Sequence, residues 1–153
     1  MADSMILELV EDENLGRVVT RIRVENLEDL FAERKGSLPS EQVRRIDVME
    51  ALVDTGSIML ALPTRYIQQL GLKKVRERTV VTTRGIATAA IFDAVRVTIM
   101  GRDCVVEAME VPDVTPALIG QIPLEMLDLV VNPMAGTLTG NPAHGGEHVL
   151  ELL

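Results

Sequence analysis

The sequence is poor in aromatic residues, in basic residues and in cysteine, and each shortage argues against a class of protein. It contains two Phe, one Tyr and no Trp, and its net charge is −8. Nucleic-acid binding uses basic surfaces and aromatic platforms for bases, so we expect no nucleic-acid partner. A lone cysteine, Cys104, cannot form an intramolecular disulfide, and its place in the run CVVEAMEV predicts a small buried strand residue.

Long apolar runs and a basic leader are also missing. No stretch approaches the ~20 apolar residues of a membrane-spanning helix, so we expect no membrane partner. The first residues, MADSMILELVEDENLG, carry acids where a signal peptide carries bases, which makes the cytoplasm the expected compartment. The 153 residues are enough for one small domain that folds without disulfides or a structural metal.

The dominant hydrophobic period is two, which is typical of β-strands. In residues 16–24, Val18, Thr20, Ile22 and Val24 share one face, and arginines occupy most of the other. We expect further strands at 43–54, 78–83, 89–100 and 104–111, and short helices at 26–35, after Pro63 and after Pro123. The first helix would begin at Asn26, with Asp29 in a variant of the capping box, and would end at Gly36. The pattern predicts an all-β, mainly antiparallel closed barrel with short helices.

One short motif carries chemistry. The apolar run ALV leads directly into Asp54, Thr55, Gly56 and Ser57. A carboxylate at the end of a hydrophobic strand, followed at once by Thr and Gly, resembles the active-site motif of retropepsin-like (clan AA) aspartic proteases. Ser57 in place of Ala is a mild change, since pepsin-like lobes use Ser there.

The resemblance extends along the chain. Leu118, Ile119 and Gly120 match the later pair of apolar residues and Gly of these proteases, and a helix is expected just after them. The segment ALPTRYIQQLGL looks like cellular bacterial members of the clan. The resemblance implies a retropepsin-like barrel with one lobe per chain. It divides the sequence into an N-terminal segment 1–15, a protease domain 16–140 and a C-terminal tail 141–153.

The motif occurs once, and this decides the expected assembly. An aspartic protease needs two carboxylates that share a proton. Four other aspartates are candidates for the second carboxylate: Asp93, Asp103, Asp113 and Asp128. Each is followed by a residue that does not recreate the Asp-Thr-Gly turn. The second carboxylate must then come from another copy of the chain, so we expect a homodimer with the site on its two-fold axis.

The resemblance also implies roles for residues. Asp54 of each chain would activate water for attack on a peptide or protein substrate, without a cofactor or metal. Gly56 would allow close approach, and Thr55 would bond across the dimer axis. The expected flap, which would close over an extended peptide, consists of Arg84, Gly85, Ile86, Ala87 and Thr88. Leu118, Ile119 and Gly120 would support the Asp54 loop from behind.

The sequence departs from the viral members of this family at two places. Where viral enzymes carry further acids after the Asp-Thr-Gly-Ala run, this chain has Ile58 and Met59, and where they carry an Arg after the later Gly it has Gln121 and Ile122. The dimer therefore cannot use that ion pair. The expected flap contains a single Gly, Gly85, where viral flaps are richer in glycine.

Other interpretations remain open at this point. Asp before Thr-Gly also forms ordinary turns, and a fold of this kind can serve as a non-hydrolytic dimerisation or peptide-binding module. His144 and His148 fit an H-x-x-E-H zinc pattern, but Gly145 and Gly146 make the required helix costly. The basic residues of 73–78 predict a solvated sheet edge or, alternatively, a rim that favours acidic substrates. The tail end VLELL could pack at the dimer interface or fray.

Overall fold

The computed structural model describes residues 17–132 and 134–152, and within these residues the chain is mainly β with three short α-helices. The expected all-β class is therefore confirmed. The expected N-terminal segment 1–15, the predicted first strand residue Gly16 and the last tail residue Leu153 lie outside the described residues. No helix in the described ranges is long and apolar enough to cross a membrane.

The elements follow in chain order. The strands are β1 Val19–Asn26, β2 Arg45–Val53, β3 Leu60–Pro63, β4 Lys74–Thr82, β5 Gly85–Ile99, β6 Arg102–Val111, β7 Leu118–Ile119, β8 Leu129–Asn132 and β9 Thr137–Gly140. The helices are α2 Leu27–Arg34, α3 Thr64–Gln69 and α4 Gln121–Met126, with short 3-10 helices η1 Ser40–Gln42 and η2 Pro142–His144.

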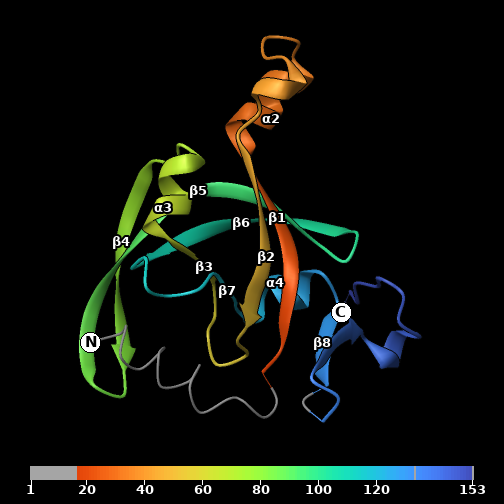
Figure 1. The fold of residues 1–153 in the computed structure, drawn as a ribbon. Coiled ribbons are helices and arrows are strands. Elements are labelled where there is room, and N and C mark those ends of the chain that lie inside the picture. Colours follow the sequence, from red (N-terminus) through yellow and green to blue (C-terminus); the bar gives the residue numbers. More distant parts are fainter. Residues whose placement is uncertain (1–16, 133, 153) are drawn as a thin grey trace.

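Seven of the strands form one mixed sheet in the order β1-β2-β7-β3-β6-β5-β4, and β8 pairs with β9 separately (Figure 1). An additional antiparallel pairing joins β1 to β5, where Val24 lies opposite Val97. This pairing connects the strands from β1 round to β5 into a closed circuit, and β4 extends outward from β5 as an edge strand. Parallel pairs occur only where β7 joins β2 and where β3 joins β6 in the described sheet.

The alternation predicted for the first strand is confirmed, although β1 starts later and ends later than expected. Val18, Ile22 and Val24 are buried, while Arg21 and Arg23 are exposed. A β-bulge between Thr20 and Ile22 shifts the register against β2. The core that results is aliphatic, and its largest fully buried side chains are those of Ile22, Leu52, Leu60, Leu62, Leu70, Ile91, Ile99, Leu118, Ile119 and Leu127.

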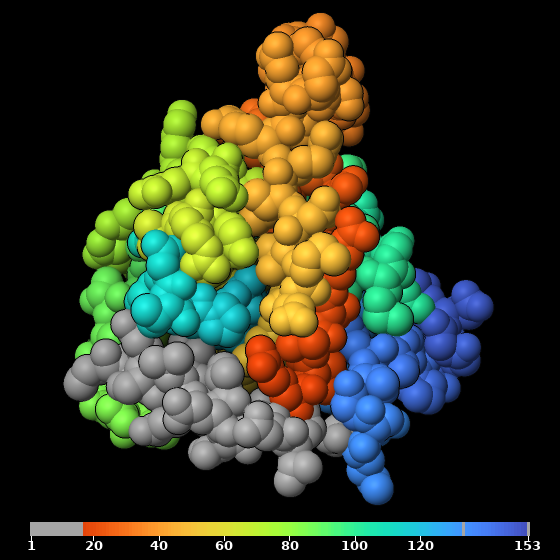
Figure 2. All heavy atoms as spheres, in the orientation of Figure 1, coloured from red at the N-terminus to blue at the C-terminus, as the bar shows by residue number. Residues whose placement is uncertain are grey.

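Helix α2 stands clear of the sheet at the top of the molecule (Figures 1 and 2). It begins as expected at Asn26, whose side-chain oxygen accepts a hydrogen bond of 3.0 Å from the Asp29 N–H. The predicted capping-box role of Asp29 was wrong. The Asn26 N–H donates to the Arg44 carbonyl, and the Asp29 carboxylate accepts from the Arg44 N–H at 2.9 Å and from its Nε at 2.8 Å. We call residues 27–44, which include α2 and η1, the projecting arm. Asp29 in the first turn of α2 ties the start of this arm to Arg44 at its end.

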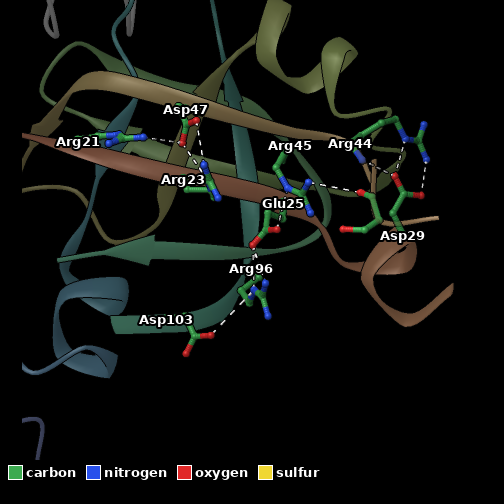
Figure 3. A network of polar contacts seen from close by, with 10 residues as sticks. Arg21, Arg23, Glu25, Asp29, Arg44, Arg45, Asp47, Arg96 and Asp103 are labelled. Carbon is green, nitrogen blue, oxygen red and sulfur yellow. Dashed lines mark hydrogen bonds and ion pairs between the residues drawn. The ribbon is translucent and has the colours of Figure 1, made fainter. Parts of the chain in front are cut away.

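A polar network fixes the strands beneath this arm (Figure 3). Glu25 is only 3% exposed, and its carboxylate accepts hydrogen bonds from Arg45 on β2 and from Arg96 on β5. Burial raises the pKa of Glu25, but the bonds from Arg96 and Arg45 outweigh burial and bring this pKa below its ordinary value. One carboxylate thus links β1, β2 and β5 at the point where the circuit closes.

Candidate active site

Asp54 follows the last residue of β2 and begins the loop that leads to β3 at the lower end of the molecule in Figure 1. Its N–H donates to the Ile119 carbonyl at 3.0 Å, and its carboxylate Oδ1 accepts from the Gly56 N–H at 2.9 Å. The Ser57 N–H donates to the Asp54 carbonyl at 3.1 Å, which closes a tight turn. The half-buried carboxylate is therefore held by its own loop, as the Asp-Thr-Gly spacing predicts.

The second predicted motif lies directly against this loop. Strand β7 runs between β2 and β3, with Ile119 opposite Val53 on one side and Leu60 on the other. Beyond it, the Gln121 N–H donates to the Ser57 carbonyl at 2.8 Å, and the Ile122 N–H donates to the Ile58 carbonyl at 2.9 Å. The structure thus brings together two motifs that are far apart in the sequence.

Gly120 explains why the later motif ends in glycine. A Cβ at this position would lie 2.5 Å from the Met59 carbonyl oxygen and 2.6 Å from the Ile58 carbonyl carbon. Both atoms belong to the backbone of the Asp54 loop, so they could not move aside without moving the loop. The close backbone approach therefore requires glycine and holds the loop against β7 and α4.

A cavity of about 1010 Å³ opens beside Asp54. Its far wall is the hairpin formed by β4 and β5, and its floor includes Met109, Val111 and Leu118, which belong to a small second apolar cluster. The described lining residues are Asp54, Gly56, Ser57, Ile58, Met59, Thr64, Glu77, Thr79, Val80, Val81, Thr82, Ala87, Thr88, Ala89, Ala90, Met109, Glu110, Val111, Pro112 and Leu118. A mostly apolar cleft with a few polar groups is the usual form of a ligand site.

The predicted flap is present as a hairpin, but its boundaries were wrong. The predicted loop 84–88 is not a loop, because β5 begins at Gly85 and pairs with Thr82 of β4. Ile86, Ala87 and Thr88 are strand residues opposite Val81, Val80 and Thr79. The turn itself contains only Thr83 and Arg84.

The flap residues differ in their relation to the cavity. Ala87 and Thr88 line it, whereas Ile86 is 74% exposed and is not among the described lining residues. Gly85 has a φ of +128°, a conformation that L-residues rarely adopt, so its place at the turn has a backbone reason. The sequence analysis missed the first residues of β4. The mix of Lys, Arg and Glu in 74–78 hides the alternation of polar and apolar residues that indicates a strand.

Thr55 lies apart from the main cavity. It is exposed and borders a smaller hollow of about 300 Å³ together with α4 and β8. Its expected bond across a dimer axis remains a prediction. The other described lining residues of this hollow are Gln121, Leu124, Leu129, Val130 and Val131.

The remaining aspartates are engaged elsewhere. Asp93 accepts from the Lys73 N–H, Asp113 accepts from the Arg65 N–H and Asp103 lies 4.0 Å from Arg96. None of these residues is among the described residues that line the cavity with Asp54. Within the described part of one chain, the site therefore contains a single aspartate.

The zinc pattern in the tail is not assembled. Nδ1 of His144 lies 2.6 Å from the Asp128 carboxylate and Nε2 lies 2.8 Å from that of Glu151, whereas Nε2 of His148 lies 3.0 Å from the Met126 carbonyl. Gly145 and Gly146 have φ values of +66° and +79°, so residues 144–148 do not form a helix. The two glycines predicted this outcome. No cluster of metal-ligating side chains occurs in the ranges that the structure describes.

The tail is instead fastened to Asp128, which follows α4. The carboxylate of Asp128 accepts from the Val149 N–H at 3.1 Å and from Nδ2 of Asn141 at 3.1 Å. Arg102 reinforces this contact, because its guanidinium donates to the carbonyls of Asp128 and Gly146. In the VLELL end these contacts reach Val149, and Glu151 through His144, so both expectations for that end, packing at a dimer interface or fraying, remain predictions.

The contact between His144 and Asp128 shifts the pKa values of both side chains. The hydrogen bond from His144 lowers the pKa of Asp128 to about 2, and the bonds to Glu151 and Asp128 raise the pKa of His144 above its ordinary value. Elsewhere, burial raises the pKa of the Cys104 thiol to about 11, which agrees with the buried, unreactive strand residue that its sequence context predicts.

No protein-family profile matches the sequence, and a search of curated proteins finds no relative.

Proposed function

We propose that the chain is one half of a retropepsin-like aspartic endopeptidase, in which two copies bring together two Asp54 carboxylates across a homodimer axis. The observation that carries this proposal is the cavity in which Asp54 lies opposite the β4–β5 hairpin. An extended peptide in that cleft has one carboxylate loop on one side and a two-stranded cover on the other. The closed circuit of strands is compatible with the one-lobe barrel that the family resemblance implies.

Three further features support the proposal. The Asp54 loop and the Leu118–Gly120 segment are joined through backbone hydrogen bonds, which fixes the carboxylate as catalysis requires. Gly120 sits where a side chain would displace the loop. The cleft contains one aspartate per chain among the described residues, so a pair of Asp54 carboxylates requires a second copy.

The chemistry follows from the shared proton. Two carboxylates about 3 Å apart cannot both ionise, so one stays protonated and the other is ionised. The ionised carboxylate takes a proton from water as the water attacks the scissile carbonyl, and the protonated partner donates a hydrogen bond to the carbonyl oxygen. The tetrahedral intermediate then collapses as a proton passes to the leaving nitrogen, which leaves a new carboxylate and a new amine.

The test compares the wild type with Asp54→Asn. Both proteins are incubated with a library of extended decapeptides between pH 3 and pH 8, and products are measured by mass spectrometry. We expect a loss of at least a thousandfold in Asp54→Asn, because Asn cannot serve as the ionised base. Asp103→Asn is the matched control, since Asp103 is exposed and lies outside the cleft, and it should cleave like the wild type.

Equal cleavage by the wild type and Asp54→Asn would contradict the proposal. Peptide binding by both proteins without cleavage by either would favour a non-hydrolytic peptide-binding module. Sedimentation provides a second check, because a chain that stays monomeric at every concentration and with bound peptide cannot assemble the two carboxylates.

A further inference from the structure

The charged residues that line the cleft are all acidic among the described residues. Three of its described lining residues are carboxylates, Asp54, Glu77 and Glu110, and none is Lys, Arg or His. One basic residue of β4, Lys74, offsets the charge of Glu77, so among the described residues Asp54 and Glu110 are the lining carboxylates that form no ion pair. Lys74 pairs with Glu77 and Arg76 pairs with Glu107, and neither basic residue lines the cavity in the described part of the chain. The sequence-based alternative of a basic rim for acidic substrates is therefore not favoured.

Glu77 and Glu110 flank a small residue on the strand between them. Glu77 of β4 lies opposite Ala90 of β5, and Glu110 of β6 follows Met109, which forms with Ile91 the last pair of the β5–β6 ladder, next to Ala90. Both carboxylates line the cavity, and two strand spacings put the outer two Cα atoms at least about 10 Å apart. Because the middle residue carries only a methyl group, there is space between the two carboxylates.

Glu110 has acceptor capacity to spare. Its Oε2 accepts one hydrogen bond of 3.0 Å from the Thr64 hydroxyl, and among the described residues it forms no ion pair. A carboxylate offers about four lone-pair positions, and a half-buried one gains most from a cationic donor. An ammonium or guanidinium group that reached between Glu110 and Glu77 would supply such donors.

We propose that Glu110, with Glu77 across Ala90, selects peptide substrates that carry a Lys or Arg side chain near the scissile bond. This inference rests on the proposed function, because it takes the cleft beside Asp54 as the substrate site. From Val53 across β7 and β3 to β6 there are three strand spacings, and Glu110 lies two residues beyond Ala108. The Cα atoms of Val53 and Glu110 are therefore within about 16 Å, which is about five residues of extended peptide.

The experiment uses acetylated and amidated decapeptides of Ser, Val and Leu, with one Lys, Arg, Gln or Glu moved through the positions. Cleavage is measured as kcat/KM for the wild type, Glu110→Gln and Glu41→Gln. Glu41 lies exposed at the projecting arm, so its variant has the same change in net charge away from the cleft. Binding of the same peptides to Asp54→Asn, measured by fluorescence anisotropy, provides a readout that needs no catalysis.

We expect one position at which Lys or Arg is favoured over Gln by about tenfold in wild type and Glu41→Gln. In Glu110→Gln the preference should fall to within about twofold, mainly through KM, and in Glu110→Lys the same position should favour Glu. The preference should also weaken in 1 M NaCl, because exposed charge pairs are screened by salt. Circular dichroism of each variant checks that it is folded.

The outcomes separate this inference from the proposed function. Cleavage that depends on Asp54 but shows no preference for a basic residue at any position would overturn the inference and leave the protease intact. A basic preference that persists in Glu110→Gln and in Glu77→Gln would also overturn it. Binding of basic peptides that Glu110→Gln abolishes, without cleavage by the wild type, would support the inference while the protease proposal fails.

Discussion

The Asp54 loop and the β4–β5 hairpin face each other across one cavity, but they are held in very different ways. The loop is bound through backbone hydrogen bonds to Ile119, Gln121 and Ile122, and its neighbours Val53 and Leu60 are buried. In the described sheet, residues 85–90 of the hairpin pair only with β4, which is itself an edge strand.

This difference divides the site into a fixed part, the Asp54 loop, and a hairpin whose described residues 85–90 pair with one neighbouring strand. Val81 near the hairpin turn is 81% exposed, although it lines the cavity. A segment with few buried contacts opens at little cost in free energy, whereas a loop fastened at several points does not. Under the proposed function, a fixed acid and a cover with fewer strand pairings suit a substrate that enters as an extended chain.

The largest effect on this comparison is expected from Gly120→Ala. The new methyl group would displace the backbone of the Asp54 loop, so we expect about 2 kcal/mol of lost stability and about a hundredfold loss in kcat/KM. Chemical denaturation and peptide cleavage measure the two effects. Gly36→Ala is the control, because Gly36 has a φ of +82° but lies after α2, away from the loop. It should lose stability without losing kcat/KM, and a fully active Gly120→Ala would show that the loop is not fixed as described.

The second largest effect is expected at Glu25, which links β1, β2 and β5 where the circuit of strands closes. Glu25→Gln should cost about 2 kcal/mol of unfolding free energy, because two arginines lose their anionic partner at a buried site. Since the pKa of Glu25 is lowered by folding, its contribution to stability is present above the ordinary pKa of 4.5 and is lost as pH falls through the folded-state pKa. Denaturation from pH 7 to pH 3 should show wild type and variant converging at low pH. A constant gap over this range would contradict the account.

The third effect tests the hairpin. Val81→Ser should lower kcat/KM by about tenfold, since a peptide under the hairpin loses an apolar contact. It should change stability by less than about 0.5 kcal/mol, because the side chain is exposed in the free chain. Val105→Ser, at an exposed position on β6 outside the cavity, is the matched control and should leave kcat/KM unchanged. A large loss of stability in Val81→Ser would place the hairpin with the fixed part of the molecule.

The smallest effect is local to the tail. Because the pKa of His144 is raised, the stabilisation from its charged form is complete below the ordinary pKa of 6.5 and is lost as pH rises through the folded-state pKa. The contribution of the Asp128 carboxylate is present above the ordinary pKa of 3.8 and is lost as pH falls toward the folded-state pKa of about 2. We therefore expect the Val149 amide to be best protected from hydrogen exchange between about pH 4 and 6.5. In Asp128→Asn, NMR titration should return the pKa of His144 toward its ordinary value, and an unchanged pKa would contradict the contact.

Local chemistry made much of this structure predictable. The alternation in β1, the cap at Asn26 and the Asp54 turn depend on residues close together in the sequence, and each was found. The meeting of Leu118–Gly120 with the Asp54 loop was expected only through the family resemblance. The pairing of β1 with β5 closes the circuit and joins residues some 70 positions apart in the sequence. No local sequence pattern predicts such a contact.

The misses have a common physical cause. Asp29 accepts from Arg44 rather than from its own helix start, because a distant guanidinium is a stronger donor than a neighbouring amide. Asp128 becomes the anchor of the tail only when the chain returns to it. In the sequence Glu77 and Glu110 look like ordinary strand carboxylates, and only the folded sheet brings both into the lining of one cavity. Each role depends on a partner that the sequence does not place nearby.

The central claim is that one chain carries half a site, and mixing two kinds of chain tests it most directly. Wild type and Asp54→Asn are unfolded together, refolded at set ratios and assayed at constant total protein. If both carboxylates of a dimer are required, activity follows the square of the wild-type fraction, so an equal mixture retains about a quarter of the wild-type activity. An equal mixture that retains half would show that each chain acts alone, and this result would contradict the account.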